Sequence, residues 1–346
     1  MRNKIYDLYS VDYLKKYKKY FQFLDNHIDE VDYLEVLPNS LLCDYLKDID
    51  YAEEELKYLD KESYISRLEC YDKLFNRLKQ CSVDRLVLKS YLDIEKNVSL
   101  KSTLLSFKYL GGETRVVKYD NFKTTTGRLV VSDGPKCLTL PAKYRGVVKS
   151  SFENGKILSA DFKSLEPRIC LKLSGGETKG DIYEEINSML SFNADRSVVK
   201  RATISLLYGS GLKGLEGLSI DRARELFNVV NNYFGYDKVS EMAQIVNEDN
   251  VRKNFFGRPI NNLMESKKHI LTNNFVQSTA VDVALMYFYK LVNKIDCKRA
   301  RPLFIIHDAI VFDVESSYES ELVEIINLGC EDEKLGFFPL KVESFN

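Results

Sequence analysis

Two aspartates stand where a metal-dependent reaction could use them, each at the end of a short apolar run. Asp161 closes the run KILSADF, and Asp308 lies between the two apolar halves of LFIIHDAIVFDV. A buried carboxylate is costly unless it is paired or metal-bound, and two carboxylates brought together repel each other. A divalent cation removes that conflict, and two Mg²⁺ ions about 3.5–4 Å apart can activate a hydroxyl and stabilise a leaving pyrophosphate. Two unrelated turn aspartates would give the same pattern, so the pair alone does not show that a metal site is present.

A second candidate is the segment DRSVVKRATISLLYG, which has the pattern of a helix. Arg196, Lys200, Ile204 and Tyr208 follow one another at intervals of four. Each such step rotates a residue by only about 40° around a helix, so the four form one slowly winding stripe. The cations of such a stripe can hold a triphosphate, and the apolar or flat groups can press on a base. The alternative is an amphipathic helix with a solvated basic edge.

A third candidate is the polar, turn-prone stretch TTTGRL. Its glycine allows a close backbone approach, and Arg128 follows directly. An arginine on a loop can reach phosphates or minor-groove acceptors. Gly-Arg pairs are common, so this signal is weak by itself.

The elements that must position these residues predict an α+β fold. Residues 1–112 have mostly helical periodicity, without a strand-like alternation, until Gly111-Gly112 breaks the pattern. Farther along, we expect helices over about 181–248, 267–294 and 317–328, a short strand ending at Asp161, a β-hairpin over 303–314 and a last strand over 338–342.

Charge is unevenly distributed along the chain. The 346 residues carry a net charge of −1, but Phe21 to Glu62 hold 13 acidic residues against 3 lysines, so this segment carries −10 and the rest +9. A basic body with an acidic segment fits a protein that binds a polyanion with part of its surface, although both could be merely solvated faces. The sequence contains no apolar run of 18 residues, so we expect no membrane span. The first residues lack the apolar core of a secretory signal, and the seven scattered cysteines predict reduced thiols.

Taken in chain order, these segments resemble the signature of family A DNA polymerases, the DNA polymerase I type. The resemblance covers about residues 115–346, and seven blocks in the family's order are far more specific than any one of them. The matching blocks are TTTGRL followed by PKCLTLP, Arg145 and Phe152; ADFKSLEPRI, which is similar to motif A; DIY at 181–183; RSVVKRATISLLYG, similar to motif B; FFGRP at 255–259; NNFVQSTAVD; and IIHDAIVF, similar to motif C.

The resemblance implies a right-hand polymerase fold with an antiparallel palm sheet, helical fingers and a helical thumb, reduced to the polymerase domain. The implied division is an acidic helical segment of unknown role at 1–60, the thumb at 61–118, the palm with motif A at 119–180, the fingers with motif B at 181–265 and the palm with motif C at 266–346.

The resemblance also implies a role for each matching residue. Asp161 and Asp308 would be the catalytic residues and bind two Mg²⁺ ions. The nucleotide would be bound by Arg196 and Lys200 at its phosphates, with help from Tyr183, by Ile204 and Tyr208 near the base, and by Glu166 beneath the sugar, where it would exclude a 2′-hydroxyl. The primer–template would be contacted by Arg128, Asn273, Gln277, His307 and Arg168.

Several positions depart from the family pattern. Ile204 stands where the family has an aromatic residue, so nucleotide stacking is expected to be looser. Ala309 stands where motif C usually has a glutamate that helps the metals, so we expect weaker activity. Tyr183 replaces a histidine, and Ser205 and Ser278 replace glycines.

The function that the resemblance implies is DNA-templated addition of deoxynucleotides to a primer, without a proofreading exonuclease domain. Primer–template DNA and deoxynucleoside triphosphates are the expected partners, and with so small a thumb we expect low processivity unless a replication or processivity partner clamps the DNA. A bacterial cytoplasm is the expected location, and the size suits a phage- or plasmid-encoded protein. Two alternatives stay open: a weak or inactive polymerase-like accessory subunit that binds primer–template, and a relative of the single-subunit RNA polymerases, against which Glu166 argues.

Overall fold

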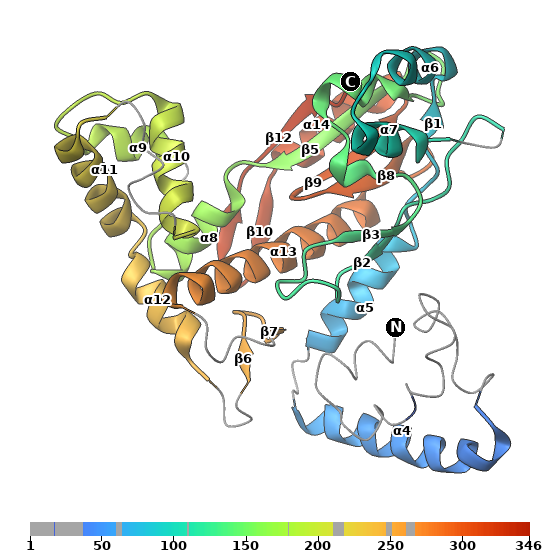
Figure 1. Ribbon diagram of the computed structural model, residues 1–346, viewed down its shortest axis with the longest axis horizontal. Coiled ribbons are helices and arrows are strands. Elements are labelled where there is room, and N and C mark those ends of the chain that lie inside the picture. Colours follow the sequence, from blue (N-terminus) through green and yellow to red (C-terminus); the bar gives the residue numbers. More distant parts are fainter. Residues whose placement is uncertain are drawn as a thin grey trace.

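The computed structural model describes residues 17, 37–59, 64–108, 111–178, 180–209, 218–246, 251–260 and 267–346, and of 52–59 only the backbone (Figure 1). Most of the acidic segment 1–60 therefore lies outside the described residues. Within the part that is described, Asn39–Leu59 forms one helix, α4. None of the described helices is long and apolar enough to cross a membrane.

The centre of the molecule is a four-stranded antiparallel sheet in the order β12-β5-β9-β8. It consists of β5 (Lys156–Phe162), β8 (Ala300–Ile306), β9 (Ala309–Val314) and β12 (Leu340–Ser344). Strands β8 and β9 are the predicted hairpin, joined by a two-residue turn at His307 and Asp308. His307 adopts φ 54°, and histidine is one of the residues enriched in this left-handed region. The turn thus presents Asp308 at the end of the sheet where β5 ends.

One long helix, α13 (Lys268–Lys294), runs along the sheet and forms much of the core (Figure 1). Its bounds match the helix predicted over 267–294. Phe162 at the end of β5 packs against Tyr287 and Phe288 of α13, with ring centroids 5.4 and 5.8 Å apart. Because α13 is covered on several sides, its buried residues lie around most of its circumference. The helix therefore supports the strand that carries Asp161.

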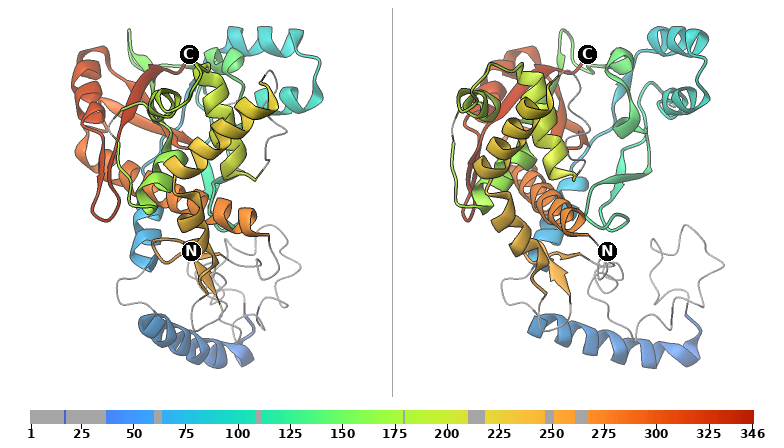
Figure 2. Two further views of the ribbon diagram at one scale, coloured as in Figure 1. Left: turned by 90° about the vertical axis from the view of Figure 1, so that its left-hand side faces the viewer. Right: turned by 60° about the vertical axis from the view of Figure 1, so that its left-hand side comes forward.

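A group of helices stands beside the sheet and carries the basic stripe (Figure 1). The helical region predicted over 181–248 is divided into α9 (Ile182–Ser188), α10 (Arg196–Leu207), α11 (Ile220–Tyr233) and α12 (Tyr236–Gln244), and α8 (Leu165–Leu173) joins it to β5. Asp181 caps α9 by accepting from the backbone N–H of Tyr183 at 2.8 Å. Seen from the side, this group and helices α6 and α7 stand apart on opposite flanks of α13 (right-hand view of Figure 2).

The stretch predicted to be a thumb is distributed over two places. Helix α5 (Tyr64–Phe75) packs against α13, whereas α6 (Arg85–Ile94) and α7 (Val98–Leu105) lie at the other end of the sheet over a second, smaller core. Residues 1–112 were expected to contain no strand, and this was wrong at β1 (Ser82–Val83), which pairs with β4 (Val148–Lys149). Two residues are too few for an alternating pattern to appear in the sequence.

The remaining short elements are β2 (Lys118–Asp120), β3 (Val130–Asp133), β6 (Arg252–Lys253), β7 (Pro259–Ile260), α14 (Glu319–Asn327), β10 (Cys330–Asp332) and β11 (Gly336–Phe338). TTTGRL lies in the loop between β2 and β3. Gly127 in this loop has φ +78°, and a Cβ at this position would lie 2.7 Å from Cζ of Arg258. The close approach expected of this glycine is therefore made to a protein side chain.

A buried polar network joins α5, α13 and the β6–β7 connection. The Asp282 carboxylate, with no exposed surface, accepts from the hydroxyls of Tyr64 at 2.7 Å and Tyr71 at 3.0 Å and from the side-chain amide of Asn254 at 2.7 Å. Arg258, also buried, donates to the Tyr64 hydroxyl at 2.8 Å. Burial raises the pKa of the Asp282 carboxyl, while the Arg258 charge and the donated hydrogen bonds act in the opposite direction. The Tyr64 hydroxyl thus connects the buried carboxylate of Asp282 to the buried guanidinium of Arg258.

Replacing Tyr64 with Phe is expected to lower the free energy of unfolding by about 2–4 kcal/mol, because both charged groups lose a hydrogen-bond partner without gaining water. Denaturant unfolding followed by circular dichroism measures this. Tyr318→Phe is the control, since the buried Tyr318 hydroxyl accepts a neutral bond from the Asp296 N–H at 3.2 Å, and the loss of this bond should cost about 1 kcal/mol. An equal loss in the free energy of unfolding for the two variants would contradict the stabilising role proposed for the Tyr64 hydroxyl in this network.

Candidate active site

A pocket of about 1340 Å³ lies between the end of the sheet, α13 and the helix group. Twelve of the thirteen predicted site residues line it, and they come from segments spread over most of the chain. They are Arg128, Asp161, Glu166, Arg168, Tyr183, Arg196, Lys200, Ile204, Tyr208, Gln277, His307 and Asp308. The thirteenth, Asn273, lies half-buried on α13 outside this lining.

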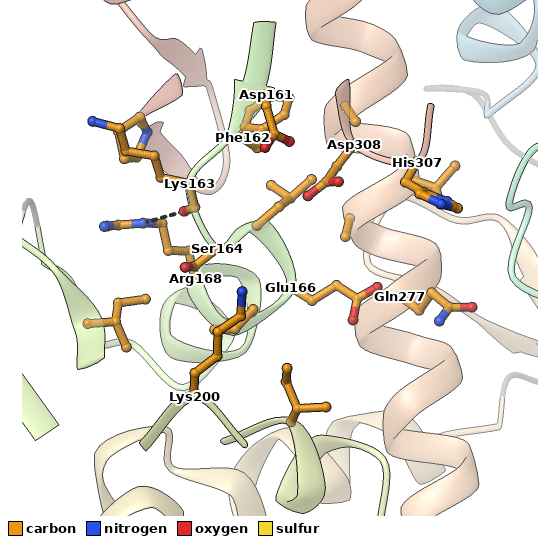
Figure 3. A pocket seen from close by; sticks show the side chains of 18 of the residues that line it. Asp161, Phe162, Lys163, Ser164, Glu166, Arg168, Lys200, Gln277, His307 and Asp308 are labelled. Carbon is orange, nitrogen blue, oxygen red and sulfur yellow. Dashed lines mark hydrogen bonds between the residues drawn. The ribbon is translucent and has the colours of Figure 1, made fainter. Parts of the chain in front are cut away.

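The two aspartates meet at one end of the sheet, as predicted. The Phe162 N–H donates to the Asp308 carbonyl at 3.3 Å, and the two side chains face the same space (Figure 3). Burial, and then repulsion by Asp161, raises the pKa of Asp308 to about 6. Burial also raises the pKa of Asp161. Two neighbouring acids whose ionisation is opposed by burial, and in Asp308 also by the other carboxylate, form a suitable site for a divalent cation.

The donor set fits Mg²⁺ but is small. In the part of the chain that the structure describes, no group of three or more His, Cys, Asp and Glu residues could hold a metal ion. Magnesium is commonly bound by one or two carboxylates together with water and substrate phosphates, so two carboxylates beside a pocket for a triphosphate are sufficient. We conclude that Asp161 and Asp308 could hold such ions jointly with a substrate.

The stripe on α10 faces the pocket as the spacing predicts. All four of its side chains are exposed and line the cavity, while Val199, Ala202 and Leu206 on the other face are buried. Arg196 pairs with Asp181 at 2.7 Å, and its guanidinium lies 4.8 Å from the ring centre of Tyr183. Lys200 extends toward the middle of the pocket (Figure 3), and its charge acts to lower the pKa of Asp161.

Glu166 connects the helix group to the TTTGRL loop. Its Oε1 accepts from Nη2 of Arg128 at 2.9 Å, and its Oε2 accepts from the Tyr208 hydroxyl at 2.8 Å. Arg128 also donates to that hydroxyl at 3.4 Å. The three residues come from the β2–β3 loop, α8 and the end of α10, and they form one polar cluster across the pocket.

The remaining predicted DNA contacts have different settings. His307 keeps an exposed surface in the hairpin turn, and partial desolvation of its ring, followed by the Arg128 charge, lowers its pKa. Gln277 is buried on α13, where its Oε1 accepts from the Thr126 hydroxyl at 2.6 Å. In Figure 3 it lies on the side of the pocket opposite Asp161.

Arg168 does not present its guanidinium to an open groove. It is 4% exposed, and its three nitrogens donate to the carbonyls of Lys163 at 3.0 Å, Thr178 at 2.8 Å and Gly180 at 2.5 Å. All three donor atoms are therefore used to hold α8 against the loop before α9. These bonds use three of the five N–H groups of the guanidinium and indicate a structural role, while the direct DNA contact stays a prediction.

Two neighbours of the site were missed by the sequence reasoning. Asp181 holds Arg196, and Lys341 of β12 contacts Asp161 with its Nζ 3.3 Å from Oδ2. The strand predicted over 338–342 already included Lys341, but its pairing partner depends on the register of two strands about 180 residues apart. No local pattern provides that register.

Comparisons with known proteins agree with this fold. The polymerase domain of Pol1 from M. smegmatis, solved in complex with a DNA primer-template and dNTP, aligns with 71% of this chain and 51% of its own, with a TM-score of 0.57 and 19% identity. An antiparallel sheet that ends in two aspartates beside a helix group with a cationic stripe, together with this likeness, defines the right-hand polymerase fold that the sequence predicted, with its palm sheet, helical fingers and helical thumb.

The chain belongs to DNA polymerase family A, because the family model matches residues 53–344. Thermostable DNA polymerase I of Thermus filiformis is 24% identical over 260 residues, which are 65% of this chain and 31% of that protein. The Thermus aquaticus enzyme is 23% identical over 258 residues, 65% of this chain and 30% of that protein. The chain thus spans about a third of the length of these relatives.

Proposed function

We propose that the chain is a DNA-directed DNA polymerase that adds deoxynucleotides to the 3′ end of a primer. The observation that carries this proposal is the meeting of Asp161, Asp308 and the α10 stripe in one pocket, although they come from three distant segments of a chain that belongs to family A. A nucleotidyl transfer requires both halves, the carboxylates for the metal ions and the cations for the triphosphate.

The residues of the pocket have distinct proposed tasks. Asp161 and Asp308 would hold two Mg²⁺ ions, which when bound supply charge neutralisation at the reacting phosphate and lower the pKa of the primer hydroxyl. Lys200 and Arg196 would bind the triphosphate, and the contacts of Arg196 with Asp181 use its Nε and Nη2. Ile204 and Tyr208 would bound the base, which every nucleotide presents as a flat apolar face.

The nucleic acid would be held on the other side of the pocket. Arg128, with 46% of its side chain exposed, and the exposed His307 would donate to minor-groove acceptors, which are common to all correct base pairs. Gln277 and Asn273, both on α13, are proposed as further contacts. Arg168 is proposed only to hold α8. Minor-groove contacts of this kind test the shape of the pair without reading its sequence.

Primer extension tests the proposal. The protein is given a primed single-stranded DNA template, Mg²⁺ and either deoxy- or ribonucleotides, and binding of the primer–template is measured separately against salt. Extension with deoxynucleotides supports a DNA polymerase, and preferential extension with ribonucleotides would favour the RNA polymerase alternative. Salt-sensitive binding without extension would favour an accessory subunit.

Removing the Glu166 side chain tests the proposed exclusion of ribonucleotides. Glu166→Ala opens space between Arg128 and Tyr208, so the preference for deoxy- over ribonucleotides in kcat/KM is expected to fall about tenfold or more. Single-nucleotide incorporation with the two substrates measures the ratio. Glu184→Ala, which removes an exposed carboxylate on α9 outside the pocket lining, should leave the ratio unchanged. An unchanged ratio in Glu166→Ala would contradict the assigned role.

A further inference from the structure

Lys341 lies directly beside one of the two proposed metal ligands. Strand β5 is flanked by β9 and β12, and the register sets Asp161 opposite Ala309 on one side and opposite Lys341 on the other. Opposed residues of neighbouring strands point to the same face of a sheet, and so do residues two apart, such as Lys341 and Glu343. The three charged side chains therefore share one face at the edge of the pocket.

The ammonium of Lys341 is shared between two carboxylates. Its Nζ lies 3.3 Å from Oδ2 of Asp161 and 3.0 Å from both carboxylate oxygens of Glu343. Lys341 and Asp161 are 38% and 28% exposed, so their attraction is only partly screened by solvent. Glu343 is 59% exposed and lines no part of the pocket, whereas Lys341 does.

A metal ion and this ammonium would compete for the same oxygen atoms. A carboxylate that binds Mg²⁺ must direct an oxygen at the ion. The ion would then repel the ammonium of Lys341, whose Nζ lies 3.3 Å from Oδ2 of Asp161. Glu343 offers the ammonium a second partner that is already in contact, so the lysine can yield without leaving its strand position or becoming unpaired. Ala309, opposite Asp161 on the other neighbouring strand, carries no charge, so it can neither pair with Asp161 nor accept the ammonium of Lys341.

We propose that Lys341 is a positioning residue that holds Asp161 until a divalent cation replaces it, and that Glu343 then takes over the ammonium. The inference rests on the proposed function only in that Asp161 is taken as a metal ligand. It assigns the chain an internal counter-cation that sets the metal concentration at which the site fills.

Calorimetric binding of Mn²⁺ to the full chain without DNA or nucleotide is the test. Lys341→Met removes the competing cation and keeps a long unbranched side chain, so the dissociation constant for Mn²⁺ should fall about three- to tenfold. Lys341→Arg keeps the charge and should bind Mn²⁺ within about twofold of the original chain. Lys156→Met is the matched control, because Lys156 lies on the same sheet and pairs with Glu319 at 2.8 Å outside the pocket lining. It should leave Mn²⁺ affinity unchanged.

Glu343→Gln tests the second half of the proposal. It removes the alternative partner, leaves Lys341 with Asp161 alone and should weaken Mn²⁺ binding, the opposite direction to Lys341→Met. In the double variant the Glu343→Gln effect should disappear, because no ammonium is left to be passed on. An equal weakening in both backgrounds would show a direct charge effect of Glu343 and overturn the transfer.

Unchanged Mn²⁺ affinity in folded Lys341→Met, or the same tightening in Lys156→Met, would overturn the proposal. So would Mn²⁺ binding that survives Asp161→Asn unaltered, since Asp161 would then not be the contested ligand. These results are independent of primer extension, which tests the proposed function. A chain that extends primers but shows no Lys341 effect would lose only this inference.

Discussion

Asp308→Asn is expected to lower the rate of primer extension by about 10³-fold or more while leaving the fold at least as stable. The amide keeps the shape of the carboxylate but removes the charge that would hold the metal ions at the reacting phosphate. The residue lies in a tight two-residue turn between β8 and β9, so the backbone has no reason to move. Single-turnover extension at saturating Mg²⁺ and deoxynucleotide measures the loss.

Stability should move in the opposite direction to activity. Burial and Asp161 raise the folded-state pKa of Asp308 to about 6, above the value of about 3.9 for an unfolded chain. The folded protein therefore binds this proton more tightly, and the metal-free protein loses stability as the pH rises from about 4 to about 6. At pH 8 in EDTA, Asp308→Asn should remove this cost and raise the free energy of unfolding by about 1–3 kcal/mol.

Asp313, a second acid on the same hairpin, provides a control in which the effects on stability and on activity should be reversed. Asp313 of β9 accepts from the hydroxyls of Ser150 and Ser151 and from the Ser151 N–H at 2.8 Å. Asp313→Asn should lose about 1–3 kcal/mol of stability and retain extension. If Asp308→Asn kept its activity, or if both variants lost activity equally, the assignment of Asp308 to the metal site would be wrong.

The parts of the fold that sequence reasoning predicted well are those with a local period. The helix predicted over 267–294 is α13, and the four-residue spacing of Arg196, Lys200, Ile204 and Tyr208 places all four in the pocket lining. Apolar runs on either side of a two-residue turn predicted the hairpin that presents Asp308. The meeting of Asp161 and Asp308 did not follow from any period. It was predicted from the order of the blocks, and strand register produces it.

The parts that sequence reasoning missed depend on pairs of residues far apart in the chain. Tyr64 meets Asp282 and Arg258 only because α5 packs across α13, and nothing near Tyr64 in the sequence indicates a buried ion. Arg168 was predicted to bind DNA from its place in a motif, and the sequence did not indicate that three of its five N–H groups are bonded to backbone carbonyls within 12 residues of it. A motif predicts which residue type is present and leaves open the direction in which the side chain points.

The domain boundaries and the expected absence of proofreading stay predictions. Helix α5 packs against α13, whereas α6 and α7 lie over the second, smaller core, so a thumb drawn over 61–118 as one segment combines elements with separate packing partners. Residues 1–16 and 18–36 of the acidic segment lie outside the described part of the chain, so its role rests on charge alone.

Lys200→Met is expected to lower kcat/KM for the incoming deoxynucleotide about 10²-fold and to leave the affinity for primer–template nearly unchanged. Methionine keeps a long unbranched side chain but removes the charge that would meet the triphosphate, and charge-assisted bonds to phosphate are among the strong ones. Lys200 extends into the pocket beside Glu166 and below Asp308 (Figure 3). Single-nucleotide incorporation over a range of nucleotide concentrations, with primer–template binding measured separately, gives both quantities.

The comparison that decides is with Arg201, the next residue of the same helix. Arg201 is exposed like Lys200 but lies about 100° around α10 and lines no part of the pocket. If the basic side chains of α10 only formed a solvated edge that attracts DNA, Lys200→Met and Arg201→Met would weaken primer–template binding alike and spare the nucleotide. If the stripe binds the triphosphate, Arg201→Met stays within about threefold of the original kcat/KM and only Lys200→Met shows the loss. Arg201 has the same charge as Lys200, is also exposed and is its neighbour in the chain, but its side chain points in another direction. The pair of variants therefore separates phosphate binding from general electrostatic attraction.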